Sequence, residues 1–101
     1  MKTFEDLTFE PYPGTENMTE SFKQQGIGWN NATLAFMNFP NGYGVQVFFG
    51  IRFNSDGRSN YEVRVSYKGF VIPYFLYSDF IGYQTQEQIT EIMKEVQELK
   101  N

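Results

Sequence analysis

The side chains that most often carry out chemistry in proteins are missing from this sequence, which contains no cysteine and no histidine. Their absence removes the thiolate nucleophile, the disulfide, the zinc–thiolate site and the imidazole general base. Carboxylates, lysines and tyrosines remain, but they are scattered and form no nucleophile-and-base arrangement. The sequence therefore predicts a protein that is not an enzyme and that uses no cofactor.

Two short motifs partly match ligand-binding loops. Asp56-Gly57 lies in a polar loop, but no pair of acidic residues has the spacing of a metal site. Asn41-Gly42-Tyr43-Gly44 is rich in glycine, but neither the lysine nor the serine or threonine of a phosphate-binding loop follows it. We therefore expect no metal site and no phosphate-binding loop.

Arg52 and Arg64 are predicted to lie beside aromatic side chains, among them Phe48. This combination is typical of surfaces on which the bases of single-stranded nucleic acid stack. Eight basic residues face twelve acidic ones, however, and the net charge is -4, whereas a nucleic-acid-binding domain normally presents a basic face. The charge balance favours the alternative, a solvated pair of arginines that Glu62 neutralises.

The composition is that of one folded domain spanning residues 1–101. Hydrophobic residues make up 41% of the chain and aromatic residues 19%, which is enough to form a core and favours a β-sheet over a helix bundle. Residues 1–10 lack the apolar stretch of a signal peptide, and no apolar run is long enough to cross a membrane. We therefore expect a cytoplasmic protein with no membrane partner.

The dipeptide Asn41-Gly42 separates two apolar runs and predicts a two-residue β-hairpin turn, because both turn positions need positive φ. Counting back from this turn places Phe36 opposite Val47 and Leu34 opposite Phe49. These pairs are apolar and share one face, as the two-residue period of a strand requires.

Two further strands are expected beyond this hairpin. Tyr61–Tyr67 alternates apolar and polar residues, and a loop centred on Gly57 places Val63 opposite Ile51 and Glu62 opposite Arg52. The turn Lys68-Gly69 then leads into residues 70–77. Pro73 has no amide hydrogen to donate to a ladder, so that last strand is predicted at the sheet edge. Together the strands form a four-stranded antiparallel β-meander over residues 30–77.

An amphipathic helix is predicted over residues 85–100. Thr85 and Gln88 have the spacing of a capping box, and apolar residues follow at helical intervals. The expected fold class is α+β, with this helix packed on one face of the sheet. The covered face would contain Leu34, Phe36, Val47, Phe49, Val63, Val65 and Ile72.

The opposite face of the sheet, called the second face here, is the predicted binding surface. One helix covers only one face, and an uncovered apolar face usually marks an interface. The alternative is that the irregular N-terminal arm, residues 1–26, folds over it with Phe4, Leu7, Phe9 and Trp29. The candidate partner-binding residues are Met37, Phe39, Phe48, Arg52, Arg64 and Phe75.

Three segments resemble a recurring pattern: FPNGYGVQVFFG (residues 39–50), YEVRV (61–65) and IGYQTQEQITEIM (81–93). They are similar to small proteins encoded by bacteriophages and prophages of Gram-positive bacteria, over about the last two-thirds of the chain. The resemblance implies a protein that acts in the host cytoplasm by binding a host protein. An inhibitor of a host defence nuclease, of the anti-CRISPR type, is the leading hypothesis by this analogy. A single-stranded nucleic-acid or nucleotide binder, and a self-associating accessory protein that forms a homodimer, remain alternatives.

Overall fold

The computed structural model describes residues 1–12, 32–76 and 78–100, and these form an antiparallel sheet with one C-terminal helix. The α+β class is therefore confirmed, although the described residues contain six strands rather than four. In chain order the elements are the 3-10 turn η1 (Phe4–Asp6), β1 (Glu10–Pro11), β2 (Thr33–Asn38), β3 (Tyr43–Phe49), β4 (Tyr61–Tyr67), β5 (Phe70–Ile72), β6 (Ile81–Gln84) and α2 (Gln86–Gln97). Among these residues, neither helical segment has the length and apolar character needed to cross a bilayer.

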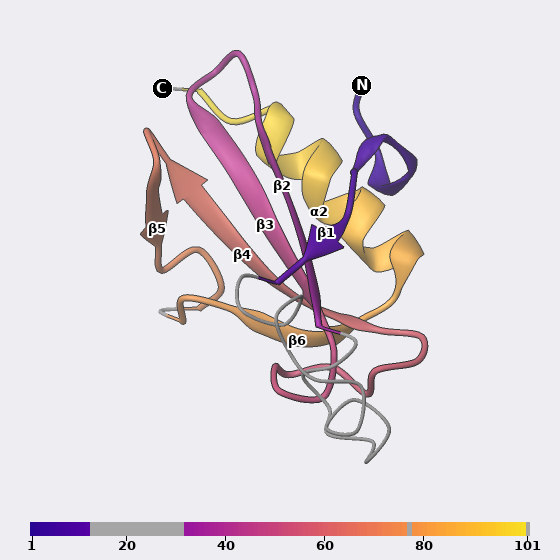
Figure 1. The fold of residues 1–101 in the computed structure, drawn as a ribbon. Helices are drawn as coiled ribbons and strands as arrows, with labels where there is room; N and C mark the ends of the chain where they lie inside the picture. The colour runs from indigo at the N-terminus through magenta and orange to yellow at the C-terminus, as the bar shows by residue number, and fades with distance from the viewer. Residues whose placement is uncertain (13–31, 77, 101) are drawn as a thin grey trace.

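The strands lie in the order β1-β2-β3-β4, and β5 and β6 share the outer edge of β4 (Figure 1). β5 pairs with Val65–Tyr67, and β6 pairs with the first half of the same strand. The prediction that residues 70–77 form one strand is wrong beyond Ile72, because the strand ends where Pro73 follows. Proline cannot donate a ladder hydrogen bond, so the chain leaves the sheet there and returns as β6. The predicted edge position of this segment is confirmed.

Past the end of β2 the Phe39 amide still donates to the Tyr43 carbonyl at 2.7 Å, which leaves the three residues 40–42 as the connection between β2 and β3. This length changes the predicted register. The amide of Gly42 donates to the carbonyl of Phe39 at 3.1 Å, and Gly42 has a φ of 90°. Pro40 has its φ fixed near the value that a type I turn needs at its first central position, and Gly42 supplies the left-handed residue that follows such a turn. Phe36 consequently pairs with Gln46 rather than with Val47. A shift of one residue turns every side chain of β2 to the opposite face.

The register between β3 and β4 also differs from the prediction, but by an even number of residues. Val63 pairs with Val47 rather than with Ile51, so each side chain of β4 keeps its predicted face. β3 ends before Ile51 because Ser55 closes the loop: its hydroxyl accepts from the Gly50 amide at 3.2 Å and donates to the Asn60 carbonyl at 2.6 Å. The predicted pairing of Glu62 with Arg52 is wrong, since Glu62 lies opposite Phe48.

Helix α2 begins at the predicted capping box. The Thr85 hydroxyl accepts from the Gln88 amide at 3.2 Å, and the Gln88 side chain accepts from the Thr85 amide at 2.8 Å. Two amides that have no partner within the helix are thereby satisfied. The helix ends at Gln97 rather than at residue 100.

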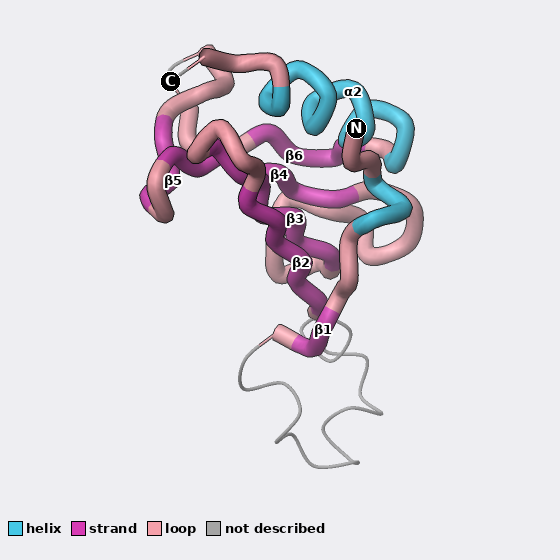
Figure 2. Tube along the Cα trace, turned by 90° about the horizontal axis from the view of Figure 1, so that it is seen from above, coloured by secondary structure: helices cyan, strands magenta, loops and turns pink. Residues whose placement is uncertain are grey.

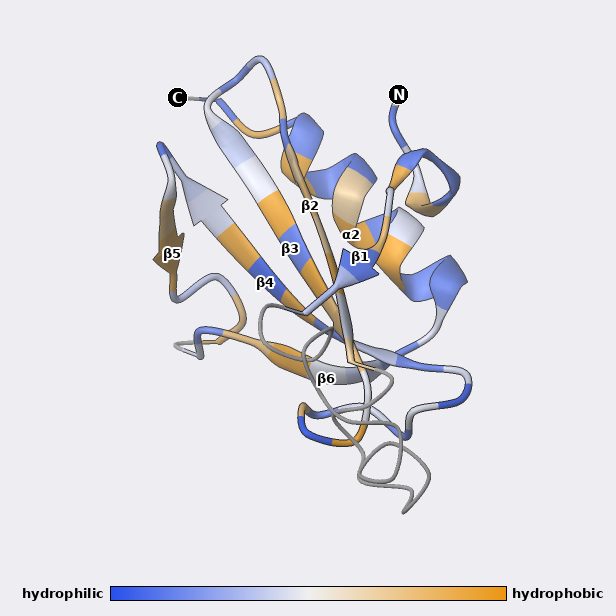
Figure 3. Ribbon diagram, viewed as in Figure 1, coloured by the Kyte–Doolittle hydropathy of each residue, from blue (hydrophilic) through white to orange (hydrophobic). Residues whose placement is uncertain are grey.

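The core lies between α2 and one face of the central strands. Its fully buried members are valines of β3 and β4 and apolar residues of the helix: Val45, Val47, Val63, Val65, Ile89, Met93 and Val96. Figure 3 shows this pattern as hydrophobic stretches of β3, β4 and α2 that alternate with hydrophilic ones. The helix therefore covers one face of the sheet and leaves the second face for other contacts.

Residues 4–9 of the N-terminal arm pack on the helix side of the sheet, before β1 joins the sheet edge (Figure 2). The Phe4 amide donates to the Thr90 hydroxyl at 3.1 Å, and its ring lies 5.1 Å from that of Tyr61. Phe9 also packs against Tyr61, at 5.6 Å. The alternative in which Phe4, Leu7 and Phe9 cover the second face is therefore wrong, and Trp29 lies outside the described residues.

Candidate functional site

Three of the predicted binding residues do not lie on the second face. Met37 and Phe39 pack against the core beneath the helix, where Phe39 is buried, because the hairpin shift reverses the face of β2. Phe75 also packs against this core, since the chain has left the sheet after Ile72. The prediction that these three residues form an exposed surface is wrong.

Phe48 and Arg64 do lie together on the second face, as predicted. The guanidinium carbon of Arg64 is 4.6 Å from the centre of the Phe48 ring, within the range of a cation–π contact. Arg52 lies beyond the end of β3, above the rings of Tyr12 at 4.7 Å and Phe53 at 5.7 Å. Phe53 in turn packs against Phe48 with 4.8 Å between ring centres. The structure therefore brings Phe48 and Arg64 into direct contact, with Arg52 one ring away.

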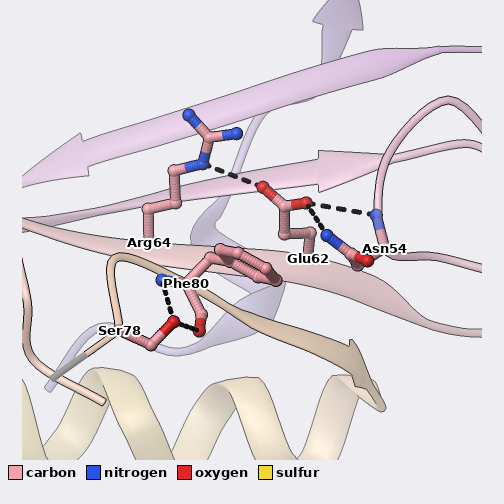
Figure 4. Close-up of polar contacts among 5 residues, drawn as sticks. All are labelled: Asn54, Glu62, Arg64, Ser78 and Phe80. Atoms are coloured by element: carbon pink, nitrogen blue, oxygen red, sulfur yellow. Dashed lines mark hydrogen bonds and ion pairs between the residues drawn. The ribbon is translucent and has the colours of Figure 1, made fainter. Parts of the chain in front are cut away.

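Glu62 is a buried carboxylate that holds Arg64 in place (Figure 4). Its exposed fraction is only 2%. One carboxylate oxygen accepts from the amide of Asn54 at 3.1 Å and from its side chain at 2.8 Å. The other accepts from Nε of Arg64 at 2.8 Å. A buried carboxylate is tolerated only when it is hydrogen-bonded and paired in this way.

A pocket of about 310 Å³ opens beside Arg64. Phe36, Gln46 and Arg64 form one row across three strands, and Leu34 and Phe48 belong to the adjacent row. Phe36 is 67% exposed although it is aromatic. We call this the Arg64 pocket, and its lining residues are Tyr12, Leu34, Phe36, Gln46, Phe48 and Arg64.

A second concentration of exposed apolar side chains lies along the edge formed by β5, the connecting segment and β6. We call it the edge surface and define it by Phe70, Val71, Leu76 and Phe80. Phe70 is 76% exposed and Leu76 is 94% exposed. Sequence reasoning missed this surface by assigning residues 70–77 to one regular strand. Pro73 was the available signal. It separates the apolar residues 70–72 from the apolar residues 74–76, and a proline cannot continue a hydrogen-bonded ladder from one group to the other.

Local hydrogen bonds fix the shape of the edge surface. The Ser78 hydroxyl donates to the Phe80 carbonyl at 3.0 Å and accepts from the Phe80 amide at 3.4 Å (Figure 4). Leu76 has a φ of 47°, in the left-handed region that a leucine rarely occupies. Such strain is often stored at functional sites, because the surrounding structure must hold the residue there.

The edge surface borders a hollow of about 450 Å³ between the connecting segment, β6 and α2. Leu76 and Phe80 line it together with Ile92 of the helix. Tyr74 anchors this region, since its hydroxyl donates to the Glu95 carboxylate of α2. Burial, and then the hydrogen bond and the charge of Glu95, raise the pKa of Tyr74 above its usual value. Most of the lining of the hollow is apolar, and Tyr74, Gln84 and Glu95 supply its polar groups.

Asp56, whose sequence motif partly matches a metal-binding loop, has its carboxylate engaged by its own loop. It accepts from the amides of Arg58 and Ser59 at 2.9 Å each. These hydrogen bonds lower the pKa of Asp56 to about 2. Among the described residues, no group of three or more acidic side chains is placed to hold a metal ion.

No protein-family model, curated protein or solved structure matches the chain.

Proposed function

We propose that this chain is a non-enzymatic module that binds a partner protein through the edge surface. One observation carries the proposal: Leu76 is 94% exposed while its backbone is held at a positive φ. An exposed leucine contributes no burial to the fold, and the left-handed conformation costs about 1 kcal/mol. The positive φ belongs to a tight turn in which Phe75 and Ser78 hydrogen-bond to each other at 3.2 and 2.8 Å. Such a turn does not need a large apolar side chain at its tip, and binding a partner is the reason we infer for a leucine there.

The partner that fits is one that buries apolar side chains against the edge surface and fills the neighbouring hollow. Burying one leucine-sized side chain contributes roughly 2 kcal/mol, and a few such contacts near the centre of an interface dominate its affinity. β5 also presents backbone groups at an edge that no described strand covers. Because β5 spans only Phe70–Ile72 and Pro73 follows, side chains rather than added strand pairing would supply most of the affinity.

Because the sequence resembles those of phage and prophage proteins, we further propose that the partner is a host protein. The most specific form of this proposal is that the partner is a defence nuclease. The net charge of -4 suits a partner with a basic surface, as nucleases have where they bind nucleic acid. The protein would then act by occupying that surface. This origin and this target rest on analogy and charge alone.

Affinity capture from host lysate at near-physiological salt tests the protein-binding function. Wild-type protein is compared with Leu76→Asp, and Ile51→Asp is the matched control because Ile51 is also an exposed aliphatic residue, 57% exposed in a different loop. We expect a stoichiometric partner with wild type and with Ile51→Asp, and its loss with Leu76→Asp. Capture of no such partner, or equal capture by both variants, would contradict the proposal.

Two further measurements test self-association and inhibition of a nuclease separately. Light scattering at high concentration detects a homodimer, and a dimer that Leu76→Asp dissociates would assign the edge surface to self-association. Cleavage of target DNA by a captured nuclease, with and without the purified chain, tests inhibition directly. Unchanged cleavage at saturating protein would remove the inhibitor hypothesis while leaving protein binding intact.

A further inference from the structure

Arg64 is held in one orientation at some cost to the fold. Its anchor, Glu62, is 2% exposed, and replacing a buried ion pair by apolar residues is often neutral or even stabilising. Glu62 is fixed on its other side by two hydrogen bonds from Asn54. This arrangement orients Arg64 and leaves it little freedom, which lowers the entropic cost of binding a ligand.

The guanidinium group has donors left over. Only Nε of Arg64 donates to Glu62, and Figure 4 draws no contact from either terminal nitrogen to that carboxylate. Among the described residues these nitrogens make no hydrogen bond or ion pair with another side chain. Their planar geometry matches the two oxygens of a carboxylate.

The walls of the Arg64 pocket specify the rest of the ligand. Phe36, Phe48 and Tyr12 are aromatic, and Gln46 supplies an amide beside the arginine. The volume of about 310 Å³ is at the small end of the range for ligand pockets. One ring with one acidic group fits within such a space. A single negative charge suits it better than a phosphate, because Glu62 already offsets part of the charge of Arg64.

We propose that the Arg64 pocket binds an aromatic carboxylate, with the acid on the terminal nitrogens of Arg64 and the ring against Phe36. The acid is either a small free molecule or the C-terminal carboxylate of a peptide that ends in an aromatic residue. The site is on the second face and shares no residue with the edge surface, and it does not depend on the proposed protein-binding function.

NMR titration of the full chain with phenylacetate tests the proposal, and phenylacetamide is the neutral counterpart. Phenylacetate should shift the backbone amide signals of Gln46 and Arg64 and bind at least about tenfold more tightly than the amide. A short peptide ending in phenylalanine, with a free or an amidated carboxyl end, identifies the source. Tighter binding of the free-acid peptide than of phenylacetate assigns a peptide terminus, and the reverse assigns a free acid.

Substitutions at Arg64 test whether this side chain binds the acid. Arg64→Lys keeps a cation beside Glu62, so the fold is retained, but lysine lacks the planar pair of donors. We expect binding about tenfold weaker, and none with Glu62→Gln combined with Arg64→Gln, which leaves no buried unpaired charge. Arg58→Gln, at an exposed arginine of the 50–60 loop, should bind as wild type does.

Three results would overturn the proposal. The first is equal affinity for phenylacetate and phenylacetamide, and the second is an effect of Arg58→Gln as large as that of Arg64→Lys. The third is binding of inorganic phosphate at Arg64 as tight as that of phenylacetate, because the aromatic walls would then contribute nothing.

Discussion

The side chain of Asn41 caps the C-terminal end of helix α2, with its Nδ2 atom 2.9 Å from the carbonyl oxygen of Val96. The same nitrogen lies 2.9 Å from the carbonyl oxygen of Leu99. The last carbonyls of a helix have no amide four residues further on to pair with. The donor from the β2–β3 hairpin adds to the 3.2 Å bond that Val96 accepts from the Leu99 amide, and it pairs the Leu99 carbonyl just beyond the helix end. One side chain thus ties the hairpin turn to the helix and fixes how the two elements meet.

Replacing Asn41 should therefore destabilise the fold. We expect Asn41→Ala to lower the free energy of unfolding by about 1–2 kcal/mol, because two partly buried carbonyls each lose a donor. Asn41→Asp should cost at least as much, since it puts a negative charge at the negative end of the helix dipole. Urea denaturation measures both. Asn38→Ala, at an exposed asparagine of β2, is the control and should change stability by less than about 0.5 kcal/mol.

The hairpin also shows which parts of the fold can be predicted from sequence. Asn41-Gly42 marks the turn correctly, but the length of the connection depends on Pro40, whose fixed φ suits a type I turn and a three-residue loop. That single residue reverses the face of β2, and with it the position of Met37 and Phe39. β3 and β4 keep their predicted faces because the error in their register is even. The helix and its capping box are predictable because they depend on local spacing alone.

The candidate sites also differ in how far the sequence predicts them. Phe48 and Arg64 share a face by strand alternation, which sequence reveals. The edge surface depends on how the chain leaves the sheet after Ile72 and how Tyr74 and Phe75 pack against the core. Those contacts join residues distant in sequence, and no local pattern predicts them.

The contributions of Glu62 and Arg64 to the free energy of unfolding should be strongly coupled. Removing Arg64 alone leaves a buried carboxylate without its cation, so Arg64→Gln should cost about 1–3 kcal/mol. The double variant Glu62→Gln and Arg64→Gln removes both charges and should recover most of that loss. A double-mutant cycle in urea measures the coupling energy, expected at about 1–2 kcal/mol. Additive losses would mean that the two side chains do not depend on each other.

Leu76→Gly should leave the fold intact or stabilise it, although it removes a large apolar side chain. Glycine relieves about 1 kcal/mol of left-handed strain, and its greater freedom in the unfolded chain costs about 0.5–1 kcal/mol. We expect a change in the free energy of unfolding between zero and a gain of about 0.5 kcal/mol. Val71→Gly, on the neighbouring strand β5, should instead lose about 1 kcal/mol. A loss with Leu76→Gly as large as that with Val71→Gly would show that Leu76 packs within the fold and would remove the basis of the proposed function.

Tyr74 should make the fold sensitive to alkaline pH. Its pKa is raised in the folded state above the value of 10.0 for an unperturbed tyrosine, so the folded chain keeps a proton that the unfolded chain loses. The stabilisation from Tyr74 is therefore fully present below pH 10 and is lost as the pH rises above it. Tyr74→Phe should cost about 0.5–1.5 kcal/mol at neutral pH through the lost hydrogen bond to Glu95, and this difference from wild type should shrink between about pH 10 and 11. Urea denaturation at a series of pH values measures it, with Tyr83→Phe, at a tyrosine that is 59% exposed, as the control. A constant difference across that range would mean that the Tyr74 hydroxyl does not hold its proton more tightly in the folded chain than in the unfolded one.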